Sequence, residues 1–116
     1  MWTDERDVIM KLLEDAPGEF PRKCPCCGKK SGHVFFYRHR DEKYGSAWAW
    51  CSECQEFSHS RFEIPVWWKN MESIKLDELH GCPDNLDIIH DSIDAWTNTL
   101  LDEKAEQNKK HSDNCG

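Results

Sequence analysis

The sequence has no long apolar segment and no hydrophobic leader. Its 116 residues are 38% hydrophobic with a mean hydropathy of -0.83, and no apolar run approaches the roughly 18 residues that a bilayer requires. The first residues, MWTDERDVIMKLL, are charged from the fourth position, whereas a secretory signal contains a continuous apolar stretch. We therefore expect a cytoplasmic protein that does not associate with membranes.

The sequence also has few apolar residues from which to build a hydrophobic core. A chain of this length buries only about 60–70% of its unfolded surface. Six tryptophans and five phenylalanines partly compensate, because each aromatic side chain can bury ~150–250 Å². We expect one domain over residues 1–108 that needs an additional staple, followed by a tail over residues 109–116 that has no periodicity and frays.

No recognisable catalytic motif is present either. GKKSG at residues 28–32 does not have the GxxxxGK[ST] order of a phosphate-binding loop. HDSID at residues 90–94 contains histidine, serine and aspartate, but neighbours on a helix point in different directions and cannot form one triad. We predict that the protein is not an enzyme.

Two helices are predicted, one near each end of the chain. Residues 3–15 have Thr3 as an N-cap, acidic residues in the first turn and a stop at Pro17-Gly18. Residues 85–106 form the longer helix, because apolar side chains recur there at spacings of three and four.

Three strands are predicted between these helices. Residues 33–39 and 47–51 are rich in aromatic residues, and residues 60–66 alternate polar and apolar side chains. Pro65 either ends the third strand or confines it to an edge of the sheet.

In contrast to these absences, the chain has seven cysteines, and four of them form two CxxC pairs. CPCCG at residues 24–28 and CSEC at residues 51–54 are separated by 23 residues, counted from Cys27 to Cys51, which form the predicted hairpin. Two intervening residues let a tight turn direct both sulfurs to one point, and Gly28 can adopt the positive φ that closes such a turn. Zn²⁺ binds four thiolates in a tetrahedron. We predict one structural Zn²⁺ held by Cys24, Cys27, Cys51 and Cys54.

Four thiolates leave no open position on such an ion, so the site does not activate water. Its contribution is to folding, on the order of 10 kcal/mol in small zinc domains. The predicted fold is α+β: a small three-stranded zinc ribbon over residues 20–68, flanked by an N-terminal helix and a longer C-terminal helix.

Other roles for the cysteines agree less well with the sequence. A thioredoxin-like pair requires a βαβ setting that is not predicted here, and disulfides are rare in the cytoplasm. Cys26 is expected to be a spare thiol packed under the turn, and Cys82 and Cys115 receive no role. Three nearby histidines could replace a ligand, although a histidine in a ribbon is more often a strand or surface residue: His33, His39 and His59.

The ribbon carries most of the positive charge. Residues 22–43 contain seven basic residues against two acidic ones. Basic groups neutralise phosphates and aromatic faces stack on bases, so this segment could hold a single nucleic-acid strand. Alternatively, the aromatic residues form the core and the charges are a solvated outer face. The basic candidates are Lys29, Lys30, Arg38 and Arg40, and the interleaved aromatics are Phe35, Phe36, Tyr37 and Trp48.

The last part of the chain is acidic, with eleven acidic and five basic residues from 69 to 116. No lysine precedes Lys104 on the predicted C-terminal helix to relieve the repulsion, which favours a partner that brings positive charge and associates rapidly. An ordinary solvated face is the alternative. Four aspartates recur there at helical spacing and form a stripe almost opposite the apolar one: Asp87, Asp91, Asp94 and Asp102.

CPCCG, followed by a hairpin and WCSEC, resembles the CPCC-type cysteine-rich domains of bacteria and, more loosely, the zinc-ribbon class. The CPCC family includes small cytoplasmic proteins regarded as immunity proteins or antitoxins of polymorphic-toxin systems. The resemblance covers residues 20–60. It implies that Cys24, Cys27, Cys51 and Cys54 are metal ligands, and that Cys26 and Gly28 are members of the motif.

The leading hypothesis is a non-enzymatic inhibitor, an immunity protein or antitoxin, that covers the active site of a cognate toxin such as a basic nuclease. Its acidic contacts would be Asp87, Asp91, Asp94, Glu72, Asp77 and Glu78, with Trp67 and Trp68 as apolar anchors. The alternative is a nucleic-acid-binding or transcription-associated zinc ribbon that uses the basic hairpin. The net charge of -7 counts against this alternative.

Overall fold

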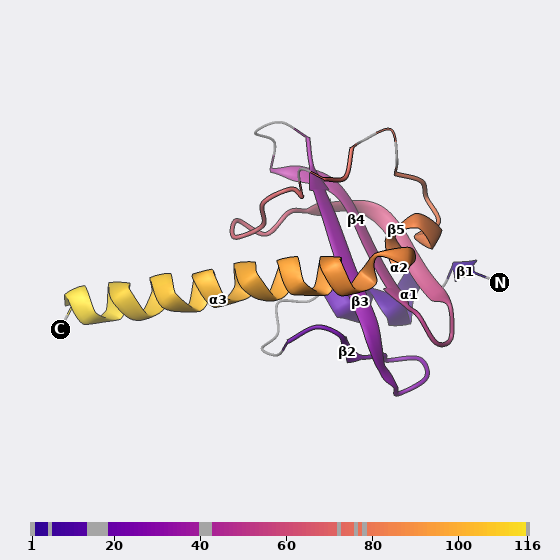
Figure 1. Cartoon of the computed structure of the whole chain (residues 1–116), viewed down its shortest axis with the longest axis horizontal. Helices are drawn as coiled ribbons and strands as arrows, with labels where there is room; N and C mark the ends of the chain where they lie inside the picture. The colour runs from indigo at the N-terminus through magenta and orange to yellow at the C-terminus, as the bar shows by residue number, and fades with distance from the viewer. Residues whose placement is uncertain are drawn as a thin grey trace.

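The protein is α+β, with a five-stranded mixed sheet covered by helices (Figure 1). The computed structural model describes residues 2–4, 6–13, 19–39, 43–71, 73–75, 77 and 79–115. In chain order the elements are β1 (Thr3–Asp4), α1 (Arg6–Ile9), the 3₁₀ helix η1 (Met10–Leu13), β2 (Arg22–Lys23), β3 (Lys30–Arg38), β4 (Tyr44–Cys51), β5 (Glu56–Glu63), α2 (Asp84–Ile88) and α3 (His90–Cys115).

The sheet has five strands in the order β1-β5-β4-β3-β2, so the prediction of a three-stranded ribbon is wrong. The three predicted strands are present as the antiparallel core β3-β4-β5, and β5 ends two residues before Pro65. A short strand is added at each edge: β2 pairs antiparallel with β3, and β1 pairs parallel with β5. Each of these has two residues, which is too few to show the alternation that identifies a strand in a sequence.

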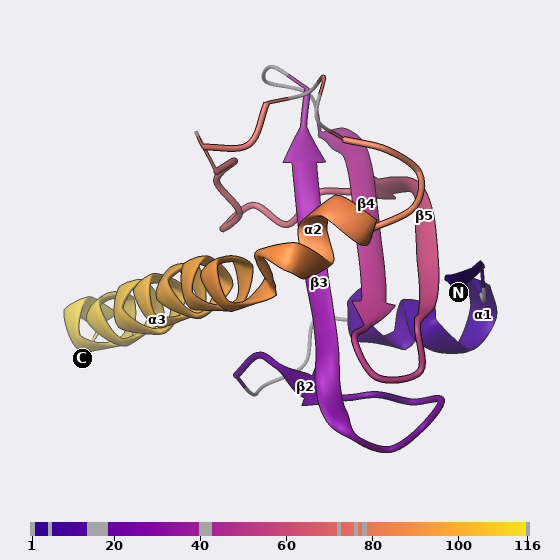
Figure 2. The ribbon, with the colours of Figure 1, turned by 45° about the vertical axis from the view of Figure 1, so that its right-hand side comes forward.

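Both faces of the sheet are buried. His33 of β3 lies opposite Trp50 of β4 on one face, and Val34 lies opposite Ala49 on the other, because successive side chains of a strand alternate. All four side chains are in the core. Figure 2 shows α2 and the start of α3 in front of the first face, with α1 and η1 behind the second. The central strands therefore read as nearly continuous apolar runs.

The N-terminal helix is shorter than the predicted span 3–15. Residues Thr3–Asp4 are a strand, and the helical segment consists of α1 followed by η1. The helical spacing of its apolar residues predicts a face of Ile9, Leu12, Leu13 and Ala16. The first three are buried against the sheet, and Ala16 lies outside the described residues. The predicted stop at Pro17-Gly18 lies outside the described residues.

The C-terminal helix is divided and is longer than the predicted span 85–106. The backbone leaves helical geometry at Ile89, between α2 and α3, and α3 then continues to Cys115 through the segment predicted to fray. Figure 1 shows the second half of α3 projecting away from the sheet. None of the helices in the described part of the chain is long and apolar enough to cross a membrane.

Candidate metal centre

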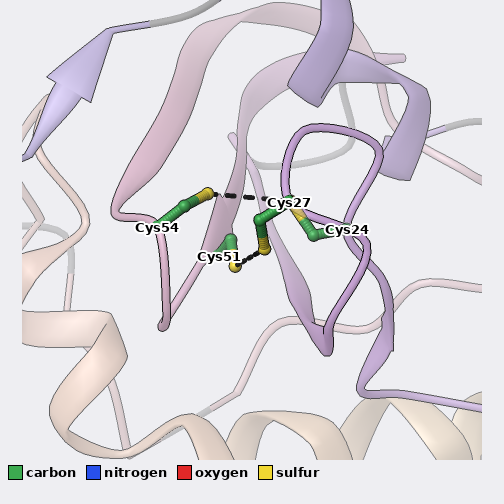
Figure 3. A group of neighbouring side chains, drawn as sticks. All are labelled: Cys24, Cys27, Cys51 and Cys54. Carbon is green, nitrogen blue, oxygen red and sulfur yellow. Dashed lines mark hydrogen bonds between the residues drawn. The ribbon is translucent and has the colours of Figure 1, made fainter.

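The two predicted cysteine pairs meet at the end of the β3–β4 hairpin. The sulfurs of Cys24 and Cys54 are 3.8 Å apart and those of Cys27 and Cys51 are 3.6 Å apart, and all four lie within 4.8 Å of one another. Figure 3 shows the four side chains converging from two turns. Tetrahedral Zn–S bonds of ~2.3 Å place two sulfurs about 3.8 Å apart. The four cysteines are therefore positioned to hold one metal ion.

Each pair lies on a turn closed by a residue with positive φ. The amide of Gly28 (φ 78°) donates to the carbonyl of Cys24, and the amide of Gln55 (φ 58°) donates to the carbonyl of Cys51. Both turns have the same length from the first cysteine. The sequence predicts the role of Gly28, but Gln55 gives no such signal, because left-handed geometry is unfavourable for a glutamine.

Hydrogen bonds support the sulfurs. The hydroxyl of Ser31 lies 3.0 Å from the sulfur of Cys51, and the amide of Cys26 donates to the sulfur of Cys24 at 3.3 Å. The thiol of Cys26 is exposed, so the prediction that it packs under the turn is wrong. None of the described cysteine thiols is in a disulfide.

The thiols ionise unequally. Burial opposes ionisation of Cys51, but hydrogen bonds from Ser31 and from the Cys54 and Glu53 amides outweigh it and lower its pKa to about 7. Burial and the neighbouring thiols raise the pKa of Cys54. The amide of Lys29 favours the thiolate of Cys27, but burial and the adjacent thiols outweigh it and raise that pKa. A cation at the centre would relieve the repulsion that keeps these thiols protonated.

Metal binding at pH 7 is expected to release at least two protons, because Cys27 and Cys54 must lose theirs and Cys51 is about half ionised. Metal affinity should therefore fall as the pH is lowered. Calorimetric titration of the chelated protein with Zn²⁺, in two buffers of different protonation enthalpy, measures the number. Binding heats that do not depend on the buffer would contradict this prediction.

The predicted acidic stripe does not form one exposed face. Asp94 is only 6% exposed, and its carboxylate accepts a hydrogen bond from His33. Asp87 is half-buried and accepts hydrogen bonds from the Trp50 indole and the Ser52 hydroxyl. The prediction that all these aspartates lie on one exposed face is wrong, because Asp87 and Asp94 accept hydrogen bonds from donors on the sheet face.

The other four predicted acidic contacts give a mixed result. Asp91 is 96% exposed at its side chain and Asp77 is exposed. Glu72 and Glu78 lie outside the described residues. These positions keep Asp91 and Asp77 available to a partner.

The two predicted tryptophan anchors are not equivalent. Trp68 is fully buried, and its ring packs against Phe35 and Phe36, so it cannot anchor a partner. Trp67 is half-buried and lies beside Phe36 and the ammonium of Lys104. Trp67 therefore remains only partly available to a partner.

Most of the aromatic candidates of the basic hairpin are not available for stacking on bases. Phe35, Phe36 and Trp48 are buried in the core, as expected if the aromatic residues form the core, whereas Tyr37 is half-buried. The guanidinium of Arg38 donates to the carbonyls of Trp68 and Pro65 and so holds the loop after β5. The remaining basic candidates differ: Lys29 lies 3.7 Å from Glu53, Lys30 is exposed, and Arg40 lies outside the described residues.

A buried polar network on the sheet face was not predicted. Nδ1 of His33 lies 2.8 Å from Asp94, and its Nε2 lies 2.7 Å from the hydroxyl of Ser52. These contacts have the connectivity of a serine–histidine–aspartate triad. However, the hydroxyl of Ser52 donates its proton to Asp87 at 2.5 Å, so it is not positioned to give that proton to His33. The sequence signal was a histidine at the start of an otherwise apolar strand.

No family model, curated protein or solved structure matches the chain.

Proposed function

We propose that the protein is a non-enzymatic inhibitor that binds a basic partner protein, in the manner of an immunity protein or antitoxin acting on its toxin. The observation that carries the proposal is an exposed apolar pair with an acidic border between α2 and α3. Ile88 is 82% exposed and Ile89 is 38% exposed. The aspartates that precede and follow them in the chain, Asp84 and Asp91, are exposed. These four residues are called the junction surface below.

The composition of the junction surface suits protein binding. Leaving an isoleucine in water forgoes ~1.5–3 kcal/mol of burial, which association with a partner would recover. Well-packed interfaces place apolar anchors at the centre and polar groups at the rim. The acidic rim would steer a basic partner and set the salt dependence of its association.

The cysteine centre supports this role by fixing the scaffold. We propose that its ion is Zn²⁺, since a tetrahedral set of soft thiolates suits that metal. Such an ion would hold the β3–β4 hairpin rigid, and a rigid binding surface loses less conformational entropy on association. The resemblance of the CPCCG segment to CPCC-type domains favours a toxin as the partner.

The experiment measures binding to the product of the neighbouring reading frame, where that product ends in a small basic toxin domain. Ile88→Arg is expected to weaken Kd by roughly 30-fold or more, because it removes an apolar anchor. Asp91→Lys is expected to slow association and reduce its dependence on salt. The matched control is Asp102→Lys, which makes the same charge change at an exposed position farther along α3 and should leave binding unaltered. Surface plasmon resonance at several salt concentrations gives both quantities.

Two results would contradict the proposal. One is unchanged association and dissociation rates for Ile88→Arg and Asp91→Lys. The other is steeply salt-dependent binding of single-stranded RNA or DNA in a filter assay, lost on Lys30→Ala, which would favour the nucleic-acid alternative.

A further inference from the structure

A second group of metal-ligating side chains lies between β3 and the first turns of α3. It consists of His33, His90 and Asp94, whose ligand atoms all lie within 4.8 Å of one another. His33 and Asp94 are buried, and His90 is half-buried. The fold brings these groups together from opposite ends of the chain, and nothing in the cysteine centre uses them.

We propose that these three residues bind a second divalent metal ion, such as Zn²⁺. Two imidazoles and a carboxylate are a donor set that Zn²⁺ accepts, and three protein ligands leave one position for water. The His33 Nδ1 lies 2.8 and 2.9 Å from the two carboxylate oxygens of Asp94. Ligand atoms on one tetrahedral zinc lie about 3.3 Å apart. His33 and Asp94 would therefore need to move apart only slightly to admit the ion.

His90 supplies the third ligand atom. Its Nδ1 is buried yet makes no hydrogen bond, although it lies 3.9 Å from Oδ2 of Asp94 and 3.2 Å from Oδ1 of Asp91. The ring lies against that of His33, with centroids 4.7 Å apart. A buried nitrogen that makes no hydrogen bond costs ~1–3 kcal/mol. An ion between His90 and Asp94 would be bound by this nitrogen. The ring of His90 would have to rotate toward the ion, and its partial exposure leaves room for that rotation.

The hydrogen bonds around His33 fit a metal ligand. The hydroxyl of Ser52 donates to Asp87, so it accepts the hydrogen bond from Nε2 of His33. That bond fixes the tautomer with the proton on Nε2 and leaves the lone pair of Nδ1 for an ion, as partners of this kind do for metal-bound histidines. Without an ion, Nδ1 lies 2.8 Å from the carboxylate of Asp94. An ion bound to Nδ1 would take the place of this direct contact.

The bound ion would connect the middle of the sheet to the start of the long helix. His33 belongs to β3, while His90 and Asp94 are one turn apart on α3. Asp91, one residue after His90, is exposed, and its carboxylate lies 3.2 Å from Nδ1 of His90. The ion would hold α3 against the sheet, independently of the cysteine centre and of any partner.

The test counts zinc in the folded chain. After dialysis against micromolar Zn²⁺, the wild-type protein is expected to hold two ions per chain and His90→Ala only one. His80→Ala, which removes another histidine that is exposed, should keep two. Co²⁺ added to protein with one equivalent of Zn²⁺ should give d–d absorption without thiolate charge transfer. In ¹H–¹⁵N spectra of the histidine rings, the second equivalent should shift His33 and His90 but not His80.

Two outcomes overturn the proposal. One is a single zinc per wild-type chain, with the ring signals of His33 and His90 unmoved by excess Zn²⁺. The other is two ions in His90→Ala, which would place the second ion elsewhere. The circular dichroism of His90→Ala is recorded in parallel, and a variant that unfolds is replaced by His90→Gln, which retains a polar side chain of similar size.

Discussion

Removing the ion of the cysteine centre is expected to unfold the protein, either by chelation or in the variant Cys51→Ser. Structural zinc contributes on the order of 10 kcal/mol to folding, whereas whole domains have only about 5–15 kcal/mol of stability. Cys51 is buried at the end of β4 and pairs with Gly32 in the sheet. Loss of the centre therefore reaches the central strands and not only the two turns.

Far-ultraviolet circular dichroism and tryptophan fluorescence measure this effect, because Trp48, Trp50 and Trp68 are buried in the folded chain. Cys26→Ser is the matched control. It removes a thiol from the same CPCC segment that is exposed and outside the ligand set, and it should leave folding unchanged. A chelated wild-type protein with the native spectrum and a cooperative unfolding transition would contradict the prediction.

Asp94→Ala is expected to lower the free energy of unfolding by roughly 3 kcal/mol, because it leaves the buried imidazole of His33 without its partner. Asp91→Ala, three residues earlier on the same helix, should change it by less than about 0.5 kcal/mol, since that side chain is 96% exposed. Urea unfolding of the variants, each loaded with only the one equivalent of Zn²⁺ that fills the cysteine centre, measures both values.

This comparison tests the correction of the acidic stripe directly. Equal effects of the two substitutions would mean that Asp94 faces solvent as Asp91 does. Asp94→Asn is the informative intermediate, since an amide oxygen can still accept the hydrogen bond of His33 without the charge. It should recover part of the loss.

The sequence predicted the central strands and the cluster of four cysteines because both leave strong local patterns. Aromatic and β-branched residues occur consecutively in β3. The two CxxC pairs lie at the two ends of a hairpin, which brings its ends side by side. Gly28 showed where the first turn closes. The buried residues Ile9, Leu12 and Leu13 followed from helical spacing, even though part of that segment is a 3₁₀ helix.

What the sequence could not show depends on contacts between distant segments. Periodicity placed Asp94 with Asp91, but the donor on His33 of β3 lies 61 residues away and decides its burial. The three- and four-residue spacing of apolar side chains continues through Ile89, so the sequence gives no sign that the helix breaks there. The break leaves Ile88 exposed. The edge strands β1 and β2 exist only because a neighbouring strand offers free backbone groups to pair with.

The most direct test of the central claim is X-ray absorption at the zinc edge of the chain loaded with one equivalent of Zn²⁺. The arrangement of Cys24, Cys27, Cys51 and Cys54 predicts a first shell of sulfur alone at about 2.3 Å. A first shell that contains nitrogen or oxygen in place of sulfur, or a chain that retains no zinc, would contradict it.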